Sequence, residues 1–299
     1  MPGEAELTER PKLDQDIIRL YDEYTHKPLD RRVFLSRLAV LAGGTAAATA
    51  ILPLLENNYA QAAIVDPADA RLETGYLTYN GASGPVRAYF AKAKSGPAKR
   101  PAIIVIHENR GLNPHLEDVA RRAAAEGFMA IAVDLLSQKG GTPASEDAAR
   151  QVHTTIDAKL AVRDLVAAVD YLGTRPDVSG KIGAVGFCFG GGMANQLAVN
   201  APKLDAAVAF YGPAPDVADV PKIKARVMLH YAGLDERINA GIAAYETALK
   251  AANVTYVKHM YEGVNHAFHN DLAGDRYNKE AATLAWSRTI AFFKQNLVG

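Results

Sequence analysis

The sequence predicts an α/β fold in which a mostly parallel central sheet carries helices on both faces. Short apolar runs alternate along the chain with amphipathic stretches long enough for helices. The runs are continuously apolar, as in strands that helices cover on both sides. Such alternation is typical of parallel strands joined by right-handed crossovers. The 299 residues, 49% hydrophobic and 22% charged, fit one large globular domain or two small ones.

The first two runs differ from the rest because they alternate between polar and apolar residues. They lie at 75–79 and 86–90, around a glycine-rich turn, and predict an antiparallel hairpin. The continuous runs predict strands at 102–106, 129–133, 182–185, 206–210 and 227–230, and the more polar run at 255–261 predicts a strand nearer an edge. Helices are expected at 117–126, 145–172, 239–252 and 278–297.

Charge and cysteine content exclude several classes of protein. Basic and acidic residues number 33 each, so the chain lacks the basic excess of a nucleic-acid-binding protein. The single cysteine, Cys188, excludes an intramolecular disulfide and a multi-cysteine metal site.

The first 62 residues read as a separate segment before a domain at 63–299. Arg31 and Arg32 precede an uncharged, alanine-rich stretch at 38–55, and Ala60-Gln61-Ala62 follows it. The combination resembles a twin-arginine export signal, which predicts a periplasmic or exported protein that meets the Tat machinery. Pro53 and the alanine content favour such an address over a stable membrane anchor.

A second interpretation of this segment is a helical extension that stays on a cytoplasmic protein. The residues before Arg31 are acidic, whereas the start of a signal peptide is usually positive. Ile17, Leu20, Tyr21 and Tyr24 also follow the spacing of one helix face.

The most informative motif is Gly186-Phe-Cys188-Phe-Gly190, between a predicted strand and a helix expected to begin near Met193. It resembles the nucleophile elbow of α/β-hydrolases, with cysteine in place of serine. The helix N-terminus would favour the thiolate. A phosphate-binding loop is a poor alternative because the Lys-Ser/Thr that would follow is missing. A plain buried cysteine is the other alternative.

Two residues follow later strands in the order that an elbow predicts. Asp235 comes just after the 227–230 run, and His266 lies in the loop before the last helix. His266 would relay the proton, and Asp235 would fix its tautomer. Glu236 is a competing acid. The remaining histidines were expected to be structural: His26, His107, His153, His230, His259 and His269.

With these motifs, residues 70–297 resemble the dienelactone hydrolase, or carboxymethylenebutenolidase, family. The resemblance also rests on the run His107-Glu-Asn-Arg-Gly-Leu112. It implies hydrolysis of a small-molecule lactone or ester through a thioester, without metal or organic cofactor. It further implies that Glu108 contacts the resting thiol, the alternative being a surface salt bridge.

The resemblance implies further site residues. The backbone N–H groups of Phe189 and Asn109 would hold the oxyanion, and Tyr211 matches a site tyrosine, with core packing as its alternative. Members that take carboxylated dienelactones use two arginines that this sequence lacks. Lys139 is the nearest cation in one of those regions, and lysine cannot bind a carboxylate in the forked manner of arginine.

Other functions use the same residues. The triad also fits an acyltransferase or an amidase, and a non-catalytic thiol-sensing or binding protein fits the same fold. The sequence leaves these alternatives open.

Overall fold

A computed structural model describes residues 13–27, 29–58 and 63–298, and its core is one eight-stranded sheet. The strand order is β1-β2-β4-β3-β5-β6-β7-β8. The strands are β1 Leu72–Gly81, β2 Gly84–Ala93, β3 Arg100–Ile106, β4 Met129–Val133, β5 Val178–Phe187, β6 Ala206–Phe210, β7 Arg226–Ala232 and β8 Tyr256–Tyr261. All pairs from β4 to β8 are parallel, whereas β1–β2 and β2–β4 are antiparallel. The predicted fold class, the hairpin and the edge position of the last strand are confirmed.

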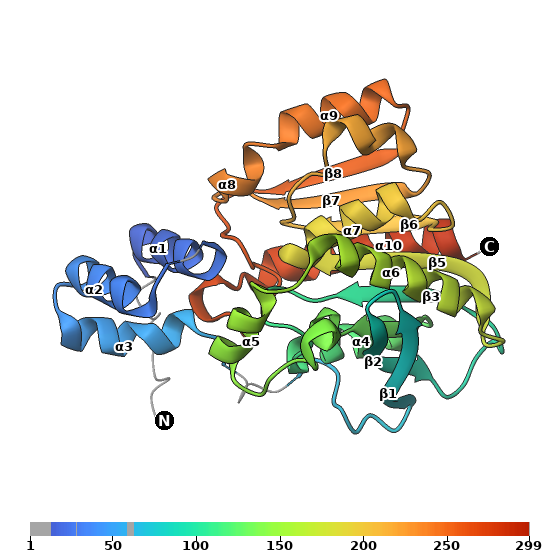
Figure 1. Ribbon diagram of the computed structural model, residues 1–299, viewed down its shortest axis with the longest axis horizontal. Coiled ribbons are helices and arrows are strands. Elements are labelled where there is room, and N and C mark those ends of the chain that lie inside the picture. Colours follow the sequence, from blue (N-terminus) through green and yellow to red (C-terminus); the bar gives the residue numbers. More distant parts are fainter. Residues whose placement is uncertain (1–12, 28, 59–62, 299) are drawn as a thin grey trace, which may run out of the picture.

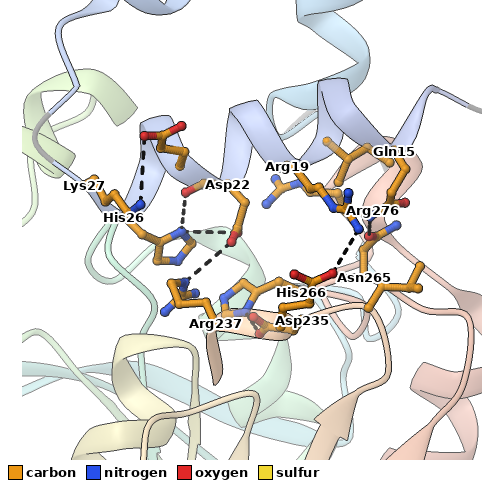
Figure 2. A pocket seen from close by; sticks show the side chains of 14 residues that line it. Gln15, Arg19, Asp22, His26, Lys27, Asp235, Arg237, Asn265, His266 and Arg276 are labelled. Atoms are coloured by element: carbon orange, nitrogen blue, oxygen red, sulfur yellow. Dashed lines mark hydrogen bonds and ion pairs between the residues drawn. The ribbon is translucent and has the colours of Figure 1, made fainter. Parts of the chain in front are cut away.

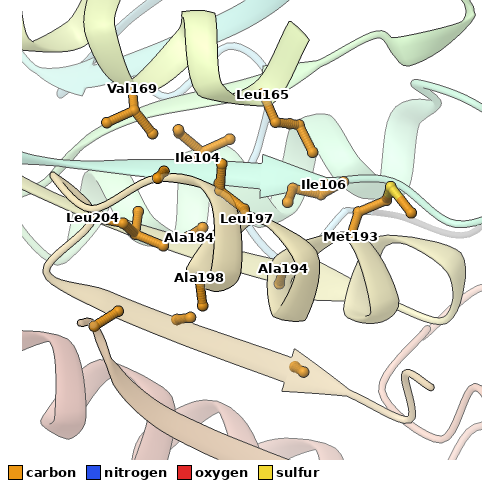
Figure 3. Close-up of a cluster of buried hydrophobic side chains, with 14 of the residues drawn as sticks. Ile104, Ile106, Leu165, Val169, Ala184, Met193, Ala194, Leu197, Ala198 and Leu204 are labelled. Carbon is orange, nitrogen blue, oxygen red and sulfur yellow. The ribbon is translucent and has the colours of Figure 1, made fainter. Parts of the chain in front are cut away.

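Helices cover both faces of the sheet (Figure 1). Strand β3 shows why, because Ile104 and Ile106 pack into one apolar cluster while Ile103 and Val105 pack into another. Successive side chains of a strand point to opposite faces, so a wholly apolar strand needs cover on both sides. The first face is covered by α6 (Ala158–Thr174), α7 (Phe189–Asn200) and α9 (Ile242–Ala251), and the second by α4 (Pro114–Ala125) and α10 (Lys279–Leu297). Figure 3 shows the first cluster, where α6 and α7 meet β3.

Three helix predictions were wrong in their boundaries. The predicted helix at 145–172 is two helices, α5 (Glu146–His153) and α6, because the Asp157 side chain caps a new helix by accepting from Lys159 N–H. The helix predicted at 239–252 begins only at Ile242, as α9, and a separate short helix, α8 (Glu236–Asn239), precedes it. Helix α7 begins at Phe189, directly after the cysteine, and not near Met193.

The N-terminal segment folds into three helices, α1 (Gln15–His26), α2 (Arg31–Ala42) and α3 (Thr45–Leu55). They form a group at one end of the molecule (Figure 1) with an apolar cluster of their own. The predicted stripe of α1 is buried in that cluster. Arg31 and Arg32 open α2, whereas Ala60-Gln61-Ala62 lies outside the described residues.

No single helix in the described ranges is long and apolar enough to cross a membrane. The helices at Arg31–Leu41 and Thr45–Leu55 together have the length and apolar composition of a membrane span, but the chain bends by 111° between them.

Candidate active site

Cys188 occupies a sharp turn between β5 and α7, where its backbone φ of 56° is strained for a residue with a side chain. Its N–H donates to the carbonyl of Phe210 on the neighbouring strand at 3.0 Å, which ties the turn to the sheet. The residue is 6% exposed. The residue caps the N-terminus of α7, where the partial positive charge of a helix stabilises negative charge.

The glycines around Cys188 are required by the closeness of the backbone. A Cβ atom on Gly186 would lie 1.8 Å from the carbonyl oxygen of Gly190. A Cβ atom on Gly190 would lie 2.3 Å from the carbonyl oxygen of Ile106 on β3. The spacing seen in the sequence therefore reflects a turn that only glycine fits on either side of the cysteine.

Asp235 and His266 form a buried pair, each 5% exposed. Asp235 follows β7, and its Oδ2 atom accepts from His266 Nδ1 at 2.5 Å. Because Nδ1 carries that proton, Nε2 of the neutral ring is left as the proton acceptor. Nε2 is buried and has no hydrogen-bond partner among the described residues. Glu236, the competing acid, instead contacts Arg19 with its side chain 81% exposed.

Glu108 is buried and bonds to two other side chains. Asn270 Nδ2 donates to its Oε2 at 2.8 Å, and the Tyr211 hydroxyl donates to its Oε1 at 3.4 Å. Its burial excludes the surface salt bridge, although no hydrogen bond joins it to the sulfur within the described part of the chain. Burial, and next the charge of Glu108, hold the pKa of Tyr211 well above its usual value, so the phenol stays protonated.

A cavity of about 450 Å³ lies beside the cysteine. Phe189, Asn109 and Tyr211 line it, as does His266. Phe189 is the first residue of α7, so its N–H has no carbonyl partner within the helix and is available to an oxyanion. Lys139 is not among the residues that line the cavity; it is the exposed last residue of a short helix, η1 (Leu135–Lys139).

The sequence analysis missed His26. This histidine, from the last turn of α1, lines the same cavity, and its Nε2 lies 3.0 Å from the Cys188 sulfur. The signal was the spacing Asp22-x-x-x-His26, which places both side chains on one face of a helix. His107 and His230, by contrast, bond within the fold as expected.

One group among the described residues has the arrangement of a metal-binding set. Donor atoms of His26, Cys188 and His266 lie within 4.8 Å of one another, and such nitrogen and sulfur atoms suit a soft divalent cation. Each imidazole also has a carboxylate within 3.2 Å of its Nδ1, an arrangement that suits acid–base chemistry.

The mostly parallel sheet, the strained turn after β5 and the aspartate and histidine after β7 and β8 define the protein as an α/β-hydrolase. The sequence model of the dienelactone hydrolase family matches residues 86–297, and the chain belongs to this family.

Similar proteins agree with this family. A predicted carboxymethylenebutenolidase of Saccharolobus solfataricus is 31% identical over 260 residues, which cover 73% of this chain and 97% of the relative. A crystal structure of a predicted dienelactone hydrolase from Klebsiella pneumoniae superposes with a TM-score of 0.68 at 27% identity, covering 75% of this chain and 99% of that one. The crystal structure of the dienelactone hydrolase-like promiscuous phosphotriesterase P91 from metagenomic libraries also superposes with a TM-score of 0.68, at 26% identity. The match covers 77% of this chain and 100% of that one. The protein is therefore an ester or lactone hydrolase.

Proposed function

We propose that the protein hydrolyses a small carboxylic ester or lactone with Cys188 as nucleophile, His266 as general base and Asp235 as its orienting acid. The observation that carries the proposal is the buried 2.5 Å contact between Asp235 and His266, a ring nitrogen of which lies within 4.8 Å of the sulfur. An oriented base beside an activated nucleophile is the arrangement that covalent catalysis needs.

The chemistry proceeds in two steps. The thiolate attacks the substrate carbonyl while the N–H groups of Phe189 and Asn109 stabilise the oxyanion, and the C–O bond breaks to leave a thioester. The departing oxygen takes a proton from a histidine beside the sulfur. His266 then removes a proton from water, the hydroxide attacks the thioester, and the acid leaves.

The cavity favours a substrate that carries a negative charge. Three cations, Lys27, Arg150 and Arg237, line it. Among the described residues that line the cavity there is no aspartate or glutamate. These three cations, and not Lys139, line the cavity. A carboxylate on the acyl or leaving group would find complementary charge there.

The first experiment compares p-nitrophenyl acetate and a carboxylated enol-lactone as substrates of the full chain, beside Cys188→Ala and His266→Ala. We expect both variants to lose turnover, and a mass increase equal to the acyl group to appear on the wild-type cysteine in acid-quenched samples. Turnover of Cys188→Ala near the wild-type rate would refute the mechanism. Acyl transfer to an added alcohol or amine in preference to water would identify an acyltransferase instead.

The cellular location is a separate proposal. We propose that residues 1–62 stay attached to the working enzyme, because α1 contributes to the cavity beside Cys188. Cell fractionation, with the N-terminus of each fraction read by mass spectrometry, tests this against export and cleavage. A mature protein that begins after residue 62 in the periplasm would contradict it.

A further inference from the structure

The sulfur of Cys188 lies beside two histidines that come from opposite ends of the chain. His266 belongs to the loop after β8, and His26 ends α1. The two rings meet edge to face, with their centres 4.8 Å apart. His26 Nε2 lies 3.0 Å from the sulfur, which is within hydrogen-bond distance for a thiolate and an imidazolium.

Each of these histidines lies beside an aspartate carboxylate. Asp22 Oδ1 lies 3.2 Å from His26 Nδ1, as Asp235 Oδ2 lies 2.5 Å from His266 Nδ1. Figure 2 shows Asp22 and His26 on α1 facing His266 and Asp235 from the core. Nδ1 of His26 is engaged by Asp22, with its carbonyl oxygen at 2.8 Å and its carboxylate at 3.2 Å, which leaves Nε2 to face the sulfur.

The electrostatic environment favours a charged His26. Burial alone lowers its pKa, but the negative charge on Cys188 and the hydrogen bond to Asp22 outweigh it and raise the pKa to about 9. A positive charge on His266 would oppose this rise. Burial also raises the pKa of Asp22, yet the positive charges around it hold that pKa well below its usual range.

Several other charged or titratable groups face this pair. Arg237 reaches Asp22 from α8 at 3.7 Å, and Lys27 and Arg150 line the same cavity. Burial, and next the charges of His107 and His26, lower the pKa of His153 to about 4, so His153 is neutral near pH 7.

Helix α1 is fixed to the hydrolase core by contacts next to His26 and at its opposite end. Asn109 Nδ2 donates to the carbonyl of Thr25 at 2.6 Å, and Arg150 donates to the hydroxyl of Tyr24 at 2.7 Å. At the other end of the helix, Gln15 donates to Asn265, next to the catalytic loop histidine, at 2.6 Å. Asn109 is also an expected oxyanion residue, so α1 supports the site at two points.

The helix does not fill the space in front of the nucleophile. With α1 in place, the cavity of about 450 Å³ remains, and His26 forms part of its wall. A small ester therefore has room to reach the sulfur past His26. The geometry favours a catalytic role for His26 over blockage of the active site by α1.

We propose that Asp22 and His26 form a second acid–base pair of the active site, so that the helix before the hydrolase domain belongs to the catalytic centre. This proposal rests on the proposed function of Cys188. In the resting enzyme His26 holds the proton and Cys188 is the thiolate, which leaves His266 neutral and ready to act as a base.

The two histidines then divide the proton transfers. When the thiolate attacks and the C–O bond breaks, the imidazolium of His26 protonates the departing alkoxide. His266 next takes a proton from water, the hydroxide attacks the thioester, and the C–S bond breaks to restore the thiolate. The proton on His266 passes by way of the sulfur to His26, which closes the cycle.

The test uses the full chain with His26→Ala and Asp22→Asn, and Arg19→Ala as a matched control. Arg19 is on the same helix and contacts Glu236 at the surface, so its removal weakens a docking contact without touching the sulfur. Two quantities are measured with EDTA present. They are kcat/KM for an alkyl ester and the rate of Cys188 alkylation by iodoacetamide at pH 6 and pH 10. Alkylation reports the thiolate fraction because the thiolate is the nucleophile.

We expect His26→Ala to lower kcat/KM by about 10²- to 10⁴-fold. Its alkylation rate should fall at least about tenfold at pH 6 and change little at pH 10, where a thiol ionises without help. Asp22→Asn should show the same pattern more weakly, and Arg19→Ala should match the wild type. Equal alkylation at pH 10 also establishes that the elbow is intact.

The opposite results are equally definite. Wild-type activity and an unchanged alkylation ratio in His26→Ala would overturn the proposal, and a rise in activity would mean that α1 inhibits the enzyme. If Cys188→Ala stays active, the proposed function itself fails. If Cys188→Ala and His266→Ala are inactive while His26→Ala is not, only the second pair is refuted.

Discussion

His26 and Cys188, 162 positions apart in the sequence, meet at 3.0 Å between Nε2 and the sulfur. The contact joins a segment outside the matched family region, residues 86–297, to the nucleophile inside it. A helix of the N-terminal segment therefore lies against the reaction centre.

Asp235→Asn should lower kcat by about 10³- to 10⁴-fold, because an amide cannot hold His266 in the tautomer that leaves Nε2 free. Steady-state hydrolysis of p-nitrophenyl acetate measures this loss. Glu236→Gln is the matched control, since that side chain is exposed and bonds to Arg19. A larger loss in Glu236→Gln than in Asp235→Asn would reverse the assignment of the acid.

Activity towards esters with poor leaving groups should decline as the pH rises through about 9. The pKa of His26 is raised from its ordinary value to about 9, so the ring is charged below that pH and loses its proton above it. An alkyl ester needs this proton on its leaving oxygen, whereas p-nitrophenolate leaves without it. Profiles of kcat/KM for the two esters should therefore diverge above pH 9, and coinciding profiles would exclude His26 as the acid.

Arg237→Ala should raise KM for a carboxylated lactone by about tenfold and leave KM for a neutral ester within about twofold, because only the anion loses a charge partner. Comparing the two substrates isolates the charge effect from any disturbance of the neighbouring Asp22. Lys139→Ala is the control, since Lys139 is exposed away from the cavity. Equal effects on both substrates would remove the argument for an anionic substrate.

Gly190→Ala should destabilise the fold by about 3 kcal/mol or more, because the new Cβ would press on the carbonyl oxygen of Ile106. Gly173→Ala is the helical control. Nothing lies within 4 Å of its Cβ position, and alanine should add about 0.5–1 kcal/mol of stability there. Urea denaturation of both variants measures the difference, and a stable Gly190→Ala would show that the elbow can relax.

Asp271→Asn should cost about 3–5 kcal/mol of unfolding free energy at pH 7, since it breaks a buried contact with His115 and Arg122. Burial raises the pKa of Asp271, but these partners outweigh it and hold that pKa well below its usual range. The difference in unfolding free energy between the wild type and Asp271→Asn is then largest above about pH 4. It decreases as the pH falls further, because the carboxylate gains a proton. Urea unfolding at pH 7 and pH 3 checks this.

A surface control defines the scale for that measurement. Asp170→Asn, which breaks the exposed pair with Lys203, should cost less than about 1 kcal/mol at either pH. An Asp271→Asn variant no less stable than this control would contradict the role of the buried contact.

The sequence by itself determined the layered fold, the elbow at Cys188 and the order of Asp235 and His266. These features are local, because the apolar period of a strand, the glycines of a tight turn and the ends of strands can all be read from neighbouring residues. Helix boundaries were less certain, as at Asp157, where one capping side chain divides a continuous amphipathic stretch.

The tertiary structure alone decided the position of His26, Arg150 and Arg237 around the nucleophile. Their places depend on how α1, α5 and α8 dock at one end of the sheet, and docking is set by packing between distant segments. Nothing in the spacing of a sequence measures that distance. For the same reason Lys139, the nearest cation along the chain, lies outside the cavity, and the cations that line it come from three separate elements.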